Sequence, residues 1–314
     1  MKCLLVMFFS VFIPVQAAFA VDARWPEKTY YRTASISGQK IFYREAGKHT
    51  NPTIVLLHGY PSSSHTYREL IPLLSGHFHV IAPDNLGSGY SSKPDSSKHP
   101  YSFDILAEYT DKLLTQLKID KYSVYMQDFG APVGFRLMMK NPNKIVSFIA
   151  QNANAYLEGI PDPKQKFFIN AQLDKSDENI KKLFNFTSKE AVKYKQYLRD
   201  VKGKEEIMNP DSWTHDALNL QQDSHRKIQV QLFQDYKTNL DSYPMWQKFM
   251  KKHQYPALIV WGKNDPVFTA NGARAYLKDN PKAKLHLVDA GHFAVEEAPV
   301  EIAKHVIQFM NQLK

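Results

Sequence analysis

Short apolar segments that alternate with longer, helix-length segments constrain the fold of this 314-residue chain more than any other feature. Continuous apolar runs are typical of strands buried on both faces, and their alternation with helices predicts βαβ units and a mostly parallel sheet. Right-handed crossovers place the carboxyl ends of such strands on one edge. The predicted strands are 29–36 and 40–44, joined by a turn at Gly38, followed by 53–57, 80–84, 123–127, 145–149, 257–261 and 284–288, with a helix over 105–117.

One long region interrupts this alternation. Residues 155–254 are helix-leaning, rich in lysine and aromatic residues, and contain no buried-strand run, whereas the strand–helix rhythm resumes at Pro256. The sequence therefore predicts a core domain formed by residues 21–154 and 255–314, with residues 155–254 inserted as a helical cap.

The first twenty residues have the composition of a secretory signal peptide. Lys2 precedes a mostly apolar run over 4–15, and small residues stand at Ala18 and Ala20. The run is too short to span a bilayer, so an uncleaved anchor is disfavoured. We expect cleavage after Ala20, a secreted or periplasmic protein, and no transmembrane segment in the mature chain. Cys3, the single cysteine, would leave with the peptide.

The charge balance does not point to a nucleic-acid partner. Forty Lys and Arg residues against 31 Asp and Glu give a net charge of +9. The lysines are nevertheless scattered, and acidic residues interrupt even the densest stretch, 181–204. A solvated basic face is the expected structure, and no nucleic-acid binding is predicted.

Residues with catalytic chemistry follow four of the predicted strands. In open parallel sheets, sites form outside the carboxyl ends of the strands, so these segments should meet. A carboxylate on a tight strand-to-helix turn, a second carboxylate and a histidine, in that order, are typical of a nucleophile–acid–base set. Each residue alone could be a helix cap, a turn carboxylate or a core histidine. The segments are His58, Gly59, Tyr60 and Pro61; Asp128 to Gly130; Asp265; and His292.

These motifs resemble the α/β-hydrolase superfamily, in its aspartate-nucleophile branch of epoxide hydrolases and haloalkane dehalogenases. Residues 58–61 match the H-G-x-P oxyanion loop, 84–94 the D-x-x-G-x-G-x-S-x-x-P stretch, and 127–130 the Q/H-D-x-G elbow, while Asp265 and His292 fill the remaining triad positions. The resemblance covers nearly everything after residue 29 and implies an α/β-hydrolase fold. Met126 departs from the small residue that serine-type elbows carry at that position.

The resemblance implies roles for these residues. Asp128, ionised at pH 7 with a reference pKa of about 3.9, would attack an sp³ carbon directly and form an ester. His292, oriented by Asp265, would activate the water that hydrolyses the ester. The N–H groups of Tyr60 and Phe129 would form the oxyanion hole. No cofactor and no metal are expected.

The leaving group separates two activities within the branch. An opening epoxide needs an acidic O–H, for which Tyr236 and Tyr156 are the candidates in the cap region. A departing halide needs N–H donors, which Tyr60 and Phe129 do not offer in their side chains. The sequence therefore favours an epoxide hydrolase acting on a small apolar or aromatic epoxide and water, with a haloalkane dehalogenase as the alternative. Trp213 and Trp246 match no known halide-binding position.

Other classes of protein fit less well. A non-catalytic binding protein on a hydrolase scaffold would tend to lose a triad member, and all three are present. A serine esterase is disfavoured because the elbow carries Asp128, with Ser123 back in the strand. A metal hydrolase would need His and Asp ligands clustered along the sequence, and no such cluster is evident.

Overall fold

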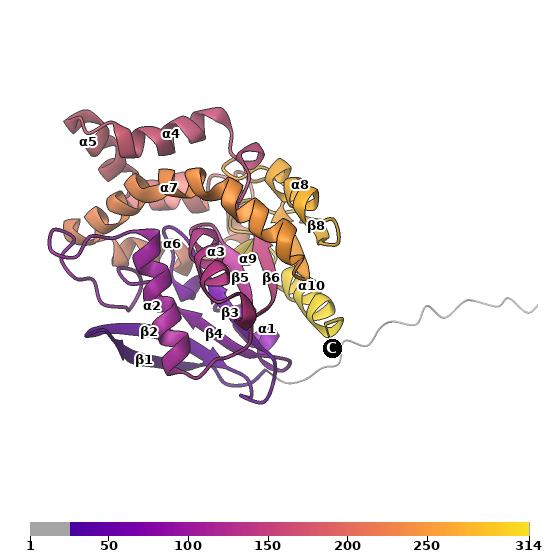
Figure 1. Cartoon of the computed structure of the whole chain (residues 1–314). Coiled ribbons are helices and arrows are strands. Elements are labelled where there is room, and N and C mark those ends of the chain that lie inside the picture. The colour runs from indigo at the N-terminus through magenta and orange to yellow at the C-terminus, as the bar shows by residue number, and fades with distance from the viewer. Residues whose placement is uncertain (1–25, 314) are drawn as a thin grey trace, which may run out of the picture.

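An eight-stranded sheet runs through the computed structural model, which describes residues 26–313 (Figure 1). In spatial order the strands are β1 (Tyr30–Ile36), β2 (Gln39–Ala46), β4 (His79–Pro83), β3 (Thr53–Leu57), β5 (Tyr122–Gln127), β6 (Ile145–Gln151), β7 (Ala257–Gly262) and β8 (Lys284–Val288). β1, β2 and β4 pair antiparallel, and all other pairs are parallel. All eight predicted strands are confirmed. The predicted signal peptide lies outside the described residues.

Alternate side chains of the central strands fill two separate cores. On β3, Ile54 and Leu56 pack in the core shared with α1 (Leu70–Ser75) and α10 (Pro299–Asn311). Val55 and Leu57 instead join the core shared with α2 (Phe103–Gln116), α3 (Gly130–Lys140) and α8 (Ala270–Asp279). Because both faces of the strand are covered by helices, both sets of side chains must be apolar, which explains the continuous apolar runs.

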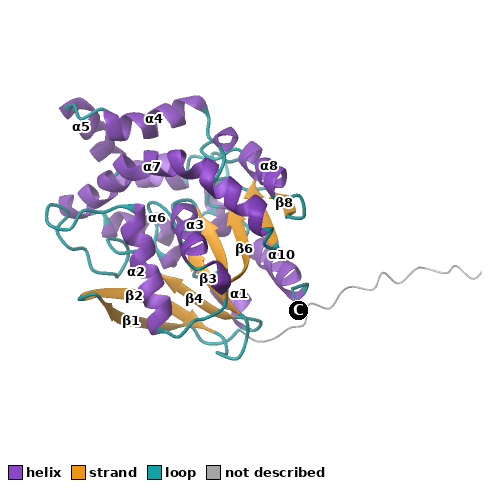
Figure 2. Ribbon diagram, viewed as in Figure 1, coloured by secondary structure: helices purple, strands orange, loops and turns teal. Residues whose placement is uncertain are grey.

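Residues 155–254 lie between β6 and β7 and contain helices but no strand. We call this segment the cap. Figure 2 shows α4, α5 and α7 together at the top of the view, above the strands, with α7 continuing down beside α3 and α8. The cap helices are α4 (Asp162–Leu173), α5 (Asp177–Phe186), a π-helical segment η4 (Ala191–Tyr197), α6 (Pro210–Asn219) and α7 (Asp223–His253). The division into two domains stays a prediction.

Several helices begin at residues whose side chains cap the first turn. Ser102 accepts a hydrogen bond from the Ile105 N–H at the start of α2, and Ser176 does the same for Asn179 at the start of α5. These caps satisfy N–H groups that have no partner within the helix.

Among the helices described for residues 26–313, none is long and apolar enough to cross a membrane.

Candidate active site

A sharp turn between β5 and α3 presents Asp128. Its φ of +50° is a left-handed conformation, and α3 begins two residues later at Gly130. A Cβ on Gly130 would lie 2.1 Å from the carbonyl oxygen of Leu57, so the helix approaches β3 too closely for any side chain there. The positive end of the helix dipole therefore stands beside the Asp128 carboxylate, where it favours negative charge.

The large residue before this turn is accommodated by a glycine in the following helix. A Cβ on Gly134 would lie 2.3 Å from the Sδ atom of Met126, whose side chain is fully buried. Met126 thus fills the space that a side chain at position 134 would need. This pairing explains how the elbow carries methionine where serine-type elbows carry a small residue.

His292 lies between two carboxylates. Its Nδ1 is 2.7 Å from Asp265 Oδ2, and its Nε2 is 3.5 Å from Asp128 Oδ2. All three side chains are buried. Burial alone would lower the pKa of His292, but the charges of Asp265 and Asp128 and the hydrogen bonds to them raise it to about 10. The two carboxylates thus favour the imidazolium form of His292 in the resting site.

Asp265 is fixed by neighbours that the sequence did not single out. Its Oδ1 accepts hydrogen bonds from the N–H groups of Val267 and Phe268, and its Oδ2 accepts one of 2.8 Å from Asn152 Nδ2. Burial raises the pKa of Asp265. The charge of His292 and the hydrogen bonds to Asp265 lower it by more, so the net effect is a decrease. Asn152 follows β6 at a φ of +46°. Its polar side chain at a strand end is the sequence feature that could have marked it as a site residue.

The predicted oxyanion loop contacts Asp128 directly. The N–H of Tyr60 donates to Asp128 Oδ1 at 2.7 Å, and the N–H of Gly59 donates to Gln127 Oε1 at 3.2 Å. A Cβ on Gly59 would lie 2.3 Å from Asp128 Cβ, so glycine is required at this contact. Phe129 stands at the N-terminus of α3, beside the loop.

His58 and the phenol of Tyr60 hold the loop in place from two sides. His58 Nε2 accepts a 3.0 Å hydrogen bond from the N–H of Asn85, which assigns its proton to Nδ1, 3.0 Å from Gly59 O. Burial lowers the pKa of His58, in keeping with a neutral, structural role. The Tyr60–Pro61 peptide bond is cis, and the Tyr60 hydroxyl donates to the carbonyl of Phe186 in the cap at 3.0 Å.

A small, partly open cavity of about 30 Å³ lies over Asp128 and His292. Typical ligand pockets measure roughly 300–1,000 Å³, so this cavity is small by comparison. Its wall combines the triad face, aromatic rings from the core and the cap, and three polar cap side chains. The lining residues are Tyr60, Asp128, Phe129, Lys164, Phe167, Phe168, Phe186, Gln196, Arg199, Phe233, Val267, Phe268 and His292.

The three polar cap residues were not predicted as site residues. Lys164 comes from α4, Gln196 from the π-helical segment η4, and Arg199 from the residues after it. Arg199 pairs with Asp200, whose Oδ2 accepts the N–H of His292 at 3.0 Å. Arg199 and Asp200 thus turn inward, although they belong to the stretch 181–204 whose lysines are mostly exposed.

The two candidate tyrosines lie in different places. Tyr156 donates its hydroxyl to Asp279 Oδ2 at 2.9 Å and does not line the cavity. Tyr236 lies one layer behind the wall: its ring stacks on Phe168 with centroids 3.9 Å apart and lies 5.4 Å from Phe129. Burial, with the nearby Tyr243 and Asp128, raises the pKa of Tyr236 well above its usual value.

None of the tryptophans in the described part of the chain lines the cavity. Trp246 stacks on Phe135, and Trp261 donates its Nε1–H to the carbonyl of Phe268 at 2.8 Å. Trp213, in α6, lies under the Lys193 ammonium. In this arrangement, no indole N–H of the described residues is available to a halide that leaves the carbon attacked by Asp128.

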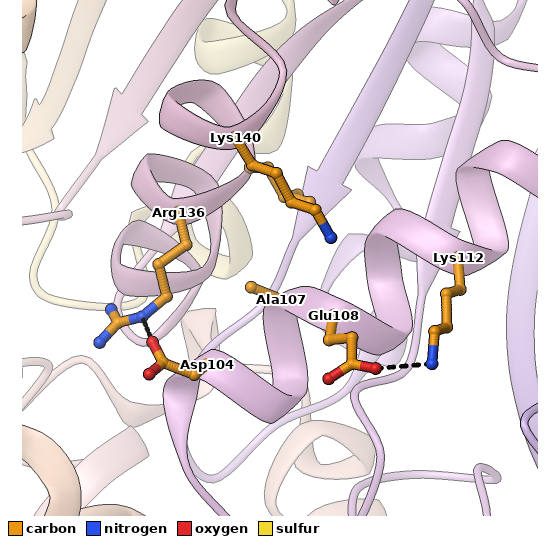
Figure 3. Close-up of a pocket in the computed structure, with 7 residues that line it drawn as sticks. Asp104, Ala107, Glu108, Lys112, Arg136 and Lys140 are labelled. Carbon is orange, nitrogen blue, oxygen red and sulfur yellow. Dashed lines mark hydrogen bonds and ion pairs between the residues drawn. The ribbon is translucent and has the colours of Figure 1, made fainter.

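A larger hollow of about 340 Å³ between α2 and α3 contains none of the triad residues (Figure 3). Its charged side chains are all paired: Arg136 with Asp104, Lys112 with Glu108, and Lys140 with Asp111 outside the hollow. It therefore presents no free functional group.

The structure also assembles a potential metal-ligating group that the sequence did not reveal. Glu45, His49 and His79 place one ligand atom each within 4.8 Å of one another. His79 is the first residue of β4, so it lies at the amino-terminal ends of the parallel strands, whereas Asp128 follows the carboxyl end of β5. Glu45 already pairs with Arg32. The cluster plays no part in the candidate active site.

Comparisons with known proteins agree on the type of fold. The model of the family described as "alpha/beta hydrolase fold" matches residues 52–299. An uncharacterized hydrolase of Saccharomyces cerevisiae is 42% identical over 274 residues, covering 86% of this chain and 93% of that protein. A haloalkane dehalogenase of Psychrobacter cryohalolentis is 27% identical, covering 87% and 88%. A solved epoxide hydrolase, CorEH, superposes with a TM-score of 0.73 at 21% identity, covering 91% and 100%.

Proposed function

Because this chain belongs to the alpha/beta hydrolase fold family, we propose that it opens epoxides to diols through a covalent ester on Asp128. The fold predicted from the sequence motifs is confirmed, and relatives include both epoxide hydrolases and haloalkane dehalogenases. The observation that carries the proposal is the position of His292, whose Nε2 lies 3.5 Å from Asp128 Oδ2 at one cavity while its Nδ1 contacts Asp265.

In the first step, an Asp128 carboxylate oxygen bonds to an epoxide carbon and the C–O bond of the ring breaks. The electron pair passes to the ring oxygen, which takes a proton from an acid. Tyr236 is the proposed donor, reaching the cavity past Phe168 when the cap side chains shift. A phenol is already protonated at physiological pH, and burial raises the pKa of Tyr236 further, so the resting side chain carries the proton.

Ester formation also prepares His292 for the second step. Asp128 loses its charge when it is alkylated, which removes one of the two carboxylates that raise the His292 pKa. The imidazolium then releases its proton, which restores the phenol of Tyr236. Neutral His292 can now accept a proton from water at Nε2.

In the second step, the activated water attacks the carbonyl carbon of the Asp128 ester. Negative charge develops on the oxygen that the Tyr60 N–H already contacts at 2.7 Å, with the Phe129 N–H as the second proposed donor. Collapse of this intermediate expels the diol, whose oxygen takes the proton from His292. One oxygen of Asp128 is then derived from water, and the proton that this oxygen still carries passes to His292, which restores the Asp128 carboxylate and the imidazolium.

Haloalkane dehalogenation would use the same triad, and the dehalogenase relatives keep it as the second candidate. Epoxide opening is favoured because no described indole lines the cavity and the phenol of Tyr236 lies one layer away. The sequence-based proposal of export to the periplasm or medium accompanies this function.

A single turnover in ¹⁸O-labelled water tests the covalent route. With wild type and a small epoxide such as styrene oxide, the label should enter Asp128, because water attacks the ester carbonyl. His292→Gln should accumulate the alkylated peptide that contains Asp128, detectable by mass spectrometry. Label found in the diol alone, together with turnover by Asp128→Ala, would show that Asp128 is not the nucleophile. Replacing the epoxide with 1-bromobutane tests the dehalogenase alternative.

A further inference from the structure

Lys164 is a cation without a carboxylate partner in the wall of the catalytic cavity. It is half-buried, and its Nζ lies 5.8 Å and 5.7 Å from the ring centroids of Phe167 and Phe186. No ion pair joins it to any carboxylate of residues 26–313. Burial lowers the pKa of Lys164, as expected for an ammonium that has lost part of its hydration.

The neighbouring cation, Arg199, does have a carboxylate partner. Arg199 is neutralised by Asp200 through two parallel hydrogen bonds, so its charge is already satisfied. Gln196 is buried beside it and offers a neutral amide to the same cavity. The uncompensated positive charge of the wall is therefore that of Lys164, with N–H donors of Gln196 and Arg199 next to it.

We propose that the substrate carries a carboxylate next to its reactive carbon, and that Lys164 binds this carboxylate with help from the adjacent Gln196 and Arg199 side chains. The inference rests on the proposed function and narrows its substrate to small epoxy acids. It departs from the apolar or aromatic substrate that the sequence alone suggested.

Electrostatics explain why such a substrate needs this residue. An anionic substrate approaching Asp128 is repelled by the nucleophile, and Lys164, which interacts with the charge of Asp265 in the same site, offsets that repulsion. The small volume of the cavity, about 30 Å³, favours compact substrates over large apolar epoxides.

The alternative is a packing role, in which the aliphatic stem of Lys164 covers the rings of Phe167 and Phe186 and the ammonium binds no ligand. Lys164→Met keeps that stem and removes the charge, so it separates packing from recognition. Lys166→Met is the matched control, because Lys166 lies on the same helix but is exposed and does not line the cavity.

The test compares glycidate with glycidamide, which share the epoxide and differ in charge. Lys164→Met should raise the KM for glycidate about 10- to 100-fold, the range for a lost charge-assisted hydrogen bond, with kcat nearly unchanged. Glycidamide should be unaffected, and Lys166→Met should behave as wild type. No change for either substrate overturns the proposal. An equal loss of kcat for both would also overturn it, because Lys164 would then serve the leaving oxygen.

A binding measurement keeps the two proposals distinguishable if neither epoxide reacts. In calorimetry, wild type should bind unreactive propionate at least tenfold more tightly than propionamide, and Lys164→Met should lose this preference. That result would support the carboxylate site even though the epoxide reaction had failed. Equal affinities for the two probes would refute it, whatever the reaction is.

Discussion

Met126 occupies the space that the missing side chain of Gly134 leaves, one turn into the helix that follows the nucleophile. A Cβ at position 134 would lie 2.3 Å from Met126 Sδ and 2.6 Å from Cγ. The two residues lie eight positions apart in the chain, yet each restricts the other. A departure from the small-residue pattern at one position is thus balanced by a glycine at the other.

Gly134→Ala should lower the free energy of unfolding by about 1–3 kcal/mol through overpacking. Alanine otherwise favours a helix interior over glycine by roughly 1 kcal/mol, so the sign of the effect is informative. In a Met126→Ala background, which removes the clash, the same Gly134→Ala change should become stabilising. Urea unfolding of the four proteins measures this. A loss of equal size in both backgrounds would mean that the two side chains do not compete for space.

Tyr236→Phe should slow ester formation with an epoxide by roughly ten- to a thousandfold, the range for a lost general acid. Hydrolysis of an ester already formed should hardly change, because it uses His292 and backbone N–H groups. Pre-steady-state kinetics separate the two steps. Tyr156→Phe is the matched control, since that hydroxyl binds Asp279, and it should leave both rates intact. Unchanged alkylation in Tyr236→Phe would assign Tyr236 to packing.

Folding stability should fall as the pH rises towards about 10. The pKa of His292 is raised to about 10 in the folded state, against about 6.5 for a free histidine, so the folded state holds this proton more tightly. The resulting stabilisation is fully present below pH 6.5 and is lost as the pH rises through about 10. Thermal melts of wild type and His292→Gln over this window should converge at the alkaline end. A constant difference between them would contradict the raised pKa.

Asn152→Asp should move the acid limb of ester hydrolysis to higher pH. The substitution keeps the left-handed backbone, which Asp tolerates, but turns a donor 2.8 Å from Asp265 Oδ2 into a second carboxylate. An added negative charge raises the pKa of both Asp265 and His292, so His292 becomes a neutral base only at higher pH. Single-turnover pH profiles would show the shift. A profile superimposable on that of wild type would remove Asn152 from the positioning of Asp265.

Export should leave a mature protein that begins at Val21. The charged start, the apolar run and the small residues before position 21 motivate this prediction. Edman sequencing of protein from the periplasm or the medium reads the terminus directly. Recovery of the full-length chain in the cytosol would contradict it.

The strands could be predicted because burial on both faces leaves an unbroken apolar run. The gathering of Asp128, Asp265 and His292 could be expected from the same runs, since each residue comes shortly after one of these strands. The same reasoning could not find Lys164 or Arg199. Cap helices are polar on several faces, and periodicity alone does not say which face turns towards Asp128. Asn152 was missed because a polar residue after a strand is common, and only the folded structure shows that its amide contacts Asp265.

Two of the hydrogen bonds between the cap and the core involve residues of the candidate site. The Tyr60 hydroxyl binds the carbonyl of Phe186, while the backbone N–H of the same Tyr60 binds Asp128. Asp200 binds the backbone N–H of His292. A displacement of the cap would break both contacts, so the position of the cap is coupled to the positions of Tyr60 and His292.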